Sequence, residues 1–111
     1  MAIKSGNSAE ALVLITDTTL LSPTTGRGVI TSLILSEQTG AGETIELFIS
    51  TNASSVAAER IETITLSANE STEPLSMPDR GIPDGSYLIA KGTTGSIVTA
   101  YLTYTQYTGA S

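Results

Sequence analysis

The sequence has 111 residues, the usual size of one domain, and it contains no cysteine, so neither a disulfide framework nor a thiolate metal site can form. Eleven acidic and five basic residues give it a net charge of −6. Because binding to a phosphate backbone relies on clustered Lys and Arg, this charge balance argues against nucleic acid as a partner.

The first nine residues are mostly small or polar and show no apolar period. They predict an N-terminal arm over residues 1–9 of a single domain spanning residues 1–111. Such an arm is either mobile or docks on a neighbouring protein. The apolar run at residues 12–15 is too short for a signal-peptide core or a membrane span. We therefore expect no targeting segment and no membrane partner.

Two β units are predicted in the first half of the chain. Residues 11–21 alternate well enough to form a first strand, which a Pro- and Gly-containing segment ends. Residues 28–51 are the clearest unit of the sequence, because two apolar runs, 29–36 and 44–50, flank a glycine-containing turn signal at 38–42. This pattern predicts a β-hairpin.

The two arms of this hairpin differ in their apolar pattern. The first arm is apolar in both phases, which predicts a strand buried on both faces. In the second arm Ile45, Leu47 and Ile49 form the inward set, so Glu46 and Phe48 look outward. An outward Phe48 either anchors a subunit contact or is covered by a loop, and the pattern favours neither.

Short elements and turns fill the next part of the chain. Residues 52–60 are predicted as a long connection, 61–66 as a strand and 71–77 as a short extended piece. Two turns follow at 78–81 and 83–85, in which proline sets φ and glycine supplies a positive φ.

The chain ends with a strand at 87–91, a turn at 92–95 and a last strand that follows it. One face of the last strand carries four apolar residues, Val98, Ala100, Leu102 and Tyr104, and the other carries Ile97, Tyr101 and Tyr107. Seven or eight short strands with frequent turns predict an all-β antiparallel β-sandwich. A jelly roll or a small barrel is the alternative.

Catalytic side chains are scarce. Histidine is absent and Lys4 and Lys91 are the only lysines, so the serines lack the common activating bases and no catalytic residue is predicted. Glu46 and Glu62 could form a carboxylate pair for glycoside hydrolysis. Acidic residues on the solvent face of a sheet are the ordinary explanation of such positions.

Three aspartates are candidate oxygen ligands for a hard cation: Asp79 and Asp84, together with Asp17. Their spacing matches no calcium loop, and aspartate beside proline and glycine usually forms turns. We therefore predict no metal site and no cofactor.

The order of the strand patterns resembles one protein family. An apolar strand ending in a polar turn at 33–40 precedes an alternating strand at 44–51, a short strand with an Ala-Asn turn at 64–69 and the closing strands at 85–104. This arrangement is similar to that of the small immunoglobulin-like sandwich proteins among the virion structural proteins of tailed bacteriophages. The resemblance spans residues 12–109.

The resemblance implies a non-enzymatic capsid decoration or cement protein that packs on the shell as a multimer. Its partners would be the major capsid protein or other virion proteins and further copies of itself, and its location the virion, assembled in the host cytoplasm. A neck, collar or tail accessory protein, and a carbohydrate-binding or adhesive module, are alternatives. We expect the contact surface to include Phe48, Ile97, Tyr101, Tyr107 and Arg80.

Overall fold

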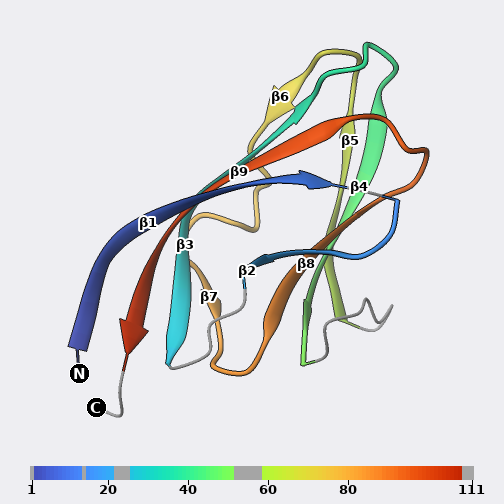
Figure 1. The fold of residues 1–111 in the computed structure, drawn as a ribbon. Coiled ribbons are helices and arrows are strands. Elements are labelled where there is room, and N and C mark those ends of the chain that lie inside the picture. The colour runs from blue at the N-terminus through green and yellow to red at the C-terminus, as the bar shows by residue number, and fades with distance from the viewer. Residues whose placement is uncertain (1, 14, 22–25, 52–58, 109–111) are drawn as a thin grey trace.

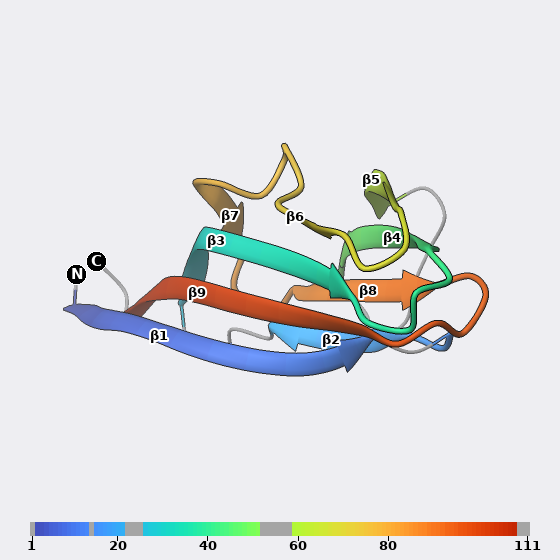
Figure 2. The same ribbon diagram turned by 90° about the horizontal axis from the view of Figure 1, so that it is seen from above.

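The computed structural model describes residues 2–13, 15–21, 26–51 and 59–108, and within residues 2–9 and 107–108 it describes the backbone alone. Nine strands in these residues form two sheets that face each other (Figures 1 and 2). They are β1 Ala2–Val13, β2 Thr18–Leu21, β3 Arg27–Glu37, β4 Glu43–Ser50, β5 Arg60–Leu66, β6 Ser71–Thr72, β7 Arg80–Ile82, β8 Tyr87–Gly92 and β9 Val98–Thr108.

The strand order identifies the type of sandwich. One sheet, called sheet A, has the order β1-β9-β3-β6, with β7 also paired to β3, and sheet B has the order β2-β8-β4-β5. Every pairing is antiparallel. The predicted all-β antiparallel sandwich is therefore confirmed. Its order is that of a jelly roll, the alternative, and it differs from the immunoglobulin arrangement that the resemblance implied.

The predicted hairpin at residues 28–51 is wrong in its pairing. Both arms are strands and the turn lies where expected, with positive φ at Gly40 and Gly42. However, β3 pairs with β9, β6 and β7, whereas β4 pairs with β5 and β8. The turn therefore carries the chain from sheet A to sheet B. A sheet-crossing connection leaves the same local pattern as a hairpin, because later strands supply the pairing partners.

The core lies between the two sheets and is built from the inner faces of their strands. Its fully buried members include Ile45 and Leu47 of β4 and Leu88 of β8. In β3 the register with β9 shifts between Ile30 and Ser32, which lets Ile30 and Leu33 both face the core despite opposite phases. Ile34 is left exposed. The β-bulge therefore explains why apolar residues occupy both odd and even positions of β3. Burial of both faces of the strand does not.

The predicted inner face of the last strand is confirmed. Val98, Ala100 and Leu102 of β9 are buried, and Tyr104 packs against the core. These residues lie at the centre of sheet A, where β9 is flanked by β1 and β3.

The N-terminal segment is arranged differently from the prediction. Residues 2–9 belong to β1 and pair with β9, so they do not form a separate arm. The single strand predicted at residues 11–21 is two strands: β1 ends at Val13 in sheet A, and β2 begins at Thr18 in sheet B. The predicted connection at 52–60 lies mostly outside the described residues.

One end of the sandwich carries four of the connections that cross between the sheets. Here β1 leads to β2, β3 to β4, β5 to β6 and β8 to β9, and we call this the crossover end. It lies to the right in Figure 2. The sandwich also has two opposite edges, since β1 and β2 border the two sheets on one side and β6 and β5 on the other.

Candidate interaction surface

The crossover end is held by Glu43, the first residue of β4, whose carboxylate is almost fully buried. Four consecutive backbone N–H groups of the β8–β9 connection, at residues 93–96, donate to it over 2.9 to 3.2 Å. The hydroxyls of Thr93 and Thr94 donate as well, both at 2.9 Å. Burial raises the pKa of Glu43, but the hydrogen bonds, beginning with the Thr44 N–H, outweigh it and lower the pKa to about 2.

A second buried carboxylate, Glu37, lies at the end of β3. It accepts hydrogen bonds from the Thr39 hydroxyl and from the backbone N–H groups of Thr39, Gly40 and Asn69, the N–H distances being 2.8 to 2.9 Å. The Thr39 hydroxyl and the Asn69 N–H lower the pKa of Glu37 to about 2. Neither Glu37 nor Glu43 was singled out from the sequence. The sequence signal that could have identified both residues is a glutamate directly beside a Thr- and Gly-containing turn.

The two candidate carboxylates for glycoside hydrolysis, Glu46 and Glu62, have separate structural roles. Glu46 forms an ion pair with Arg60 at 2.7 Å. Glu62 accepts hydrogen bonds from the backbone N–H groups of Leu75 and Ser76, at 3.2 and 3.0 Å, and from the Ser76 hydroxyl. Each of the two carboxylates is therefore bound to a different part of the chain.

The three aspartates lie in different connections. Asp17 precedes β2, Asp79 precedes β7 and Asp84 follows it. Asp79 has a φ of 61° and donates its N–H to the Ile30 carbonyl at 2.8 Å, so it is the left-handed residue of the first predicted turn, in place of Gly81. In the described part of the chain, no three acidic side chains come together in a group that could hold a metal ion.

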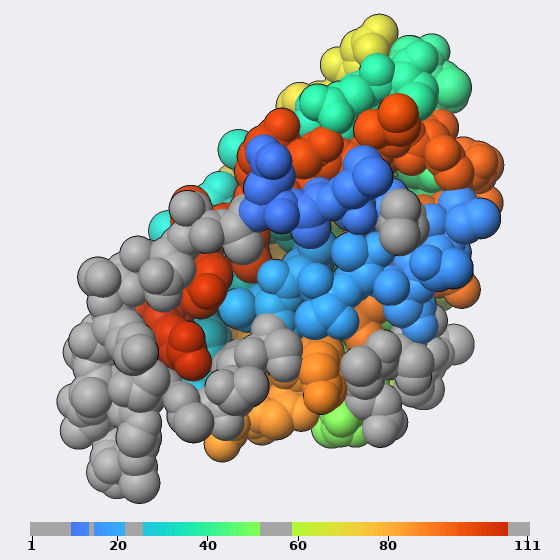
Figure 3. All heavy atoms as spheres, in the orientation of Figure 1, coloured from blue at the N-terminus to red at the C-terminus, as the bar shows by residue number. Residues whose placement is uncertain are grey.

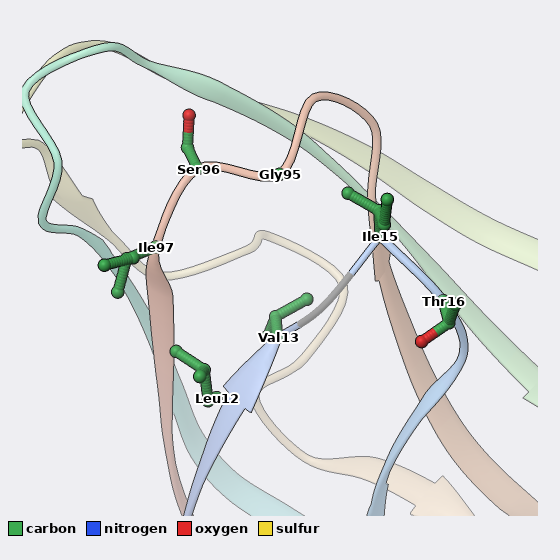
Figure 4. A pocket seen from close by; sticks show the side chains of 7 residues that line it. All are labelled: Leu12, Val13, Ile15, Thr16, Gly95, Ser96 and Ile97. Atoms are coloured by element: carbon green, nitrogen blue, oxygen red, sulfur yellow. The ribbon is translucent and has the colours of Figure 1, made fainter.

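An apolar pocket of about 350 Å³ opens at the crossover end. Leu12, Val13, Ile15 and Thr16 line one side and residues 95–97 the other, and the two segments face each other across the opening (Figure 4). Leu12, Ile15 and Ile97 are each about half exposed, at 49%, 54% and 48%. The predicted contact residue Ile97 is thus part of a hollow that also includes the β1–β2 connection.

Further apolar side chains lie on the outer face of sheet A. Tyr101 of β9 is 40% exposed and lies between Glu10 of β1 and Ile34 of β3 in register, and Ile34 is 41% exposed. Leu12 lies two residues after Glu10 in β1, in the neighbouring row of the same sheet. Figure 3 shows residues of β1 and β2 beside those of β9 on the side facing the viewer. We call Leu12, Ile34 and Tyr101 the sheet A face.

The ring of Phe48 is buried, as in the alternative that another part of the chain covers it, and Phe48 is therefore not the exposed contact residue that we expected. It is 4% exposed and lies opposite Ile89 of β8, which is also buried. Neither residue belongs to the central core cluster, because both alternate with core residues and lie on the outer side of sheet B. The alternation in the sequence was read correctly, but the solvent exposure was not.

The remaining predicted contact residues are Tyr107 and Arg80. The backbone of Tyr107 pairs with Ile3 and Arg27, and its side chain lies outside the described residues. Arg80 is half-buried in β7, and its Nε donates to the Ser76 carbonyl at 3.1 Å. Its side chain therefore holds the β6–β7 connection, and an interface role for Arg80 stays a prediction.

Two of the hollows among the described residues lie at the crossover end, and neither is lined by a tyrosine. The second, of about 300 Å³, is lined by residues 41–44 together with Thr65, Leu66 and Thr94. A carbohydrate-binding module would hold its ligand in a cleft, and neither hollow is lined by Tyr87, Tyr101 or Asp84. Within the described ranges, no helix has the length and apolar character needed to cross a membrane.

No protein-family model and no curated protein matches the chain. Among solved structures, the chain is similar to a Bacillus endospore appendage protein from a novel family of disulfide-linked pili. The TM-score is 0.59 and the sequence identity 16%, over 97% of this chain and 89% of that chain. At this identity, the similarity shows that the two chains share a fold.

Proposed function

We propose that this chain is a non-enzymatic structural subunit, copies of which pack against one another in an ordered assembly. The observation that carries the proposal is the sheet A face, where Ile34 and Tyr101 are each about 40% exposed beside the half-exposed Leu12. Exposed aliphatic and aromatic side chains on a rigid sheet are typical of protein contact surfaces. Few charges have to be desolvated there, since Glu10 is the only charged residue in the row of Tyr101 and Ile34.

The role of the buried carboxylates supports the same proposal. Glu37 and Glu43 have low pKa values and are saturated by hydrogen bonds from the chain itself. A carboxylate that is needed for general acid or base chemistry would instead have a pKa near the working pH. These two groups stabilise the sandwich, which suits a building block.

The fold similarity to an endospore pilus protein supports an assembly of many copies. That protein is described as disulfide-linked, and the present sequence has no cysteine. Copies of this chain would therefore be held together by noncovalent contacts. Weak contacts suffice for this, because each copy in an array uses several of them at once.

The proposal also specifies where the assembly forms and which protein it binds. The resemblance to virion structural proteins favours decoration of a capsid, with the major capsid protein as partner and the virion as location. Mass spectrometry of purified particles tests this setting. We expect the chain at a stoichiometry comparable to that of the shell protein, and only trace amounts would contradict a decoration role.

Self-assembly of the purified chain tests the proposal itself. We expect light scattering and negative-stain electron microscopy to show regular oligomers or polymers as the concentration rises from about 1 µM to about 1 mM. The double substitution Ile34→Asp, Tyr101→Asp should suppress them. Thr63→Asp is the matched control, because Thr63 is exposed on sheet B. Assembly that tolerates the double substitution would exclude the sheet A face as its contact surface.

A further inference from the structure

Leu75 is the most exposed large apolar side chain among the described residues, at 94%. It lies in the connection between β6 and β7. Single exposed leucines are common on protein surfaces and by themselves indicate nothing. The surroundings of Leu75 distinguish it from such cases.

The chain is attached to the sandwich on both sides of Leu75. The Leu75 and Ser76 N–H groups donate to the carboxylate of Glu62 in β5. On the other side, the Glu73 carboxylate accepts a hydrogen bond from the Leu33 N–H of β3 at 3.2 Å. We call residues 73–77 the Leu75 loop. Its neighbouring residues Pro74 and Met77 are buried, so the loop is attached to the body of the chain while one leucine projects.

The chain also has a hollow that could receive such a side chain. The apolar pocket, lined by Leu12, Val13, Ile15, Thr16 and residues 95–97, has a volume of about 350 Å³. A cavity of roughly 150 Å³ already holds a benzene-sized group, so the pocket has room for a leucine side chain. Its half-exposed lining residues Leu12, Ile15 and Ile97 would lose contact with water on occupation.

The Leu75 loop and the apolar pocket lie on opposite edges of the sandwich. The loop follows β6 and is bound to β5, and these two strands border sheets A and B on one side. The pocket is built on the β1–β2 connection, and β1 and β2 border the same sheets on the other side. In Figure 2 the β6–β7 connection projects from the side of the molecule opposite to β1 and β2. Leu75 therefore cannot fill the pocket of its own chain.

We propose that the occupant of the apolar pocket is Leu75 of a second copy of this chain. This inference rests on the proposed function and specifies one contact of the assembly. A projecting apolar residue and a complementary pocket on opposite sides of one molecule form a heterologous contact, which repeats from copy to copy into a ring or a filament. The Leu75 loop of each copy thus joins the β1–β2 edge of the next.

The contact is weak between two isolated copies. One leucine in one pocket covers much less than the roughly 1,200 to 2,000 Å² that specific stable interfaces bury. The chain is therefore monomeric when dilute, and it polymerises when every copy makes this contact together with that of the sheet A face.

Cysteine cross-linking tests the pairing directly, because the sequence contains no other cysteine. We expect a mixture of Leu75→Cys and Ile15→Cys chains, oxidised under assembly conditions, to give mixed disulfide dimers in preference to dimers of either variant alone. A chain with both substitutions should give a ladder of linked multimers. Asp84→Cys, at an exposed turn beyond β7, is the matched control and should not pair with Ile15→Cys. Dimers of Ile15→Cys alone in excess of mixed dimers would overturn the heterologous contact.

A second measurement uses the threshold concentration for assembly. Leu75→Asp should raise it at least about tenfold, whereas Leu75→Met should leave it within about twofold, because Met keeps the apolar side chain. Circular dichroism spectra should be the same in both variants, since Leu75 is exposed. An assembling chain that tolerates Leu75→Asp would overturn this contact and leave the proposed function in place. A chain that remains monomeric throughout would overturn both.

Discussion

The Glu43 carboxylate, at the first residue of β4, accepts a hydrogen bond from the backbone N–H of Thr94 at 3.0 Å, although 51 positions separate the two residues in sequence. Glu43 lies in sheet B, and Thr94 belongs to the connection that leads from β8 in sheet B to β9 in sheet A. One buried side chain therefore fixes a connection between the sheets. It also positions Gly95 against Ile15 beside the apolar pocket.

Replacing Glu43 by Gln should destabilise the chain. The amide has one acceptor oxygen where the carboxylate has two, so several N–H groups of residues 93–96 would lose their partner in a buried site. We expect the free energy of unfolding to fall by about 3 kcal/mol, measured by urea denaturation and circular dichroism. Glu46→Gln is the control. Its ion pair with Arg60 is exposed, and its loss should cost less than about 1 kcal/mol. Equal losses in both variants would contradict the structural role of Glu43.

The free energy of unfolding should decrease as the pH falls through a defined range. Glu37 and Glu43 have pKa values of about 2 in the folded chain, below the ordinary glutamate pKa of 4.5. Because the folded pKa is the lower one, the stabilisation is complete above about pH 5 and is lost progressively as the pH falls towards 2.

Thermal unfolding at a series of pH values measures this effect. The melting temperature should be nearly level from about pH 7 to 5 and should drop steeply below about pH 4. The Glu43→Gln chain should show a smaller drop, since one of the two carboxylates is gone. A drop of unchanged size in that variant would mean that other groups cause the acid sensitivity.

The sequence predicted the strands much better than their partners. The alternation of β9 was sufficient to identify Val98, Ala100 and Leu102 as core residues, because an 11-residue strand at the centre of a sheet buries one face along its length. For β3 and β4, strand and turn signals were correct but the pairing was not. Pairing depends on residues far away in sequence, and a local pattern contains no information about them.

The solvent exposure of the expected contact residues was predicted only in part. Ile97 and Tyr101 are exposed as expected, whereas Phe48 is buried beside Ile89 on the outer side of sheet B. Alternation gives the face of a sheet on which a residue lies, but solvent exposure also depends on what covers that face. Leu75 was missed because it lies in a loop, where no period distinguishes an exposed apolar residue from a buried one.

Phe48 should be important for stability and not for assembly. Truncation of a buried phenylalanine costs about 3 to 5 kcal/mol, so Phe48→Ala should lower the urea midpoint strongly. Tyr101→Ala, on the exposed sheet A face, should change the free energy of unfolding by less than about 1 kcal/mol. The reverse order of the two effects would show that the ring of Phe48 is not part of the packed chain.

Two glycines separate the effect of backbone conformation from that of close packing. Gly42 and Gly85 have nearly the same positive φ, 78° and 81°. A Cβ at Gly85 would meet no atom within 4 Å, whereas one at Gly42 would lie 3.0 Å from the Leu66 carbonyl oxygen. Gly85→Ala should therefore cost only the strain of a left-handed residue, roughly 1 to 2 kcal/mol. Gly42→Ala should cost at least about 1 kcal/mol more, because the Leu66 backbone is held by its pairing with Glu43 and cannot move freely. Urea denaturation of both variants measures the difference, and equal costs would show that β4 and β5 separate easily at the crossover end.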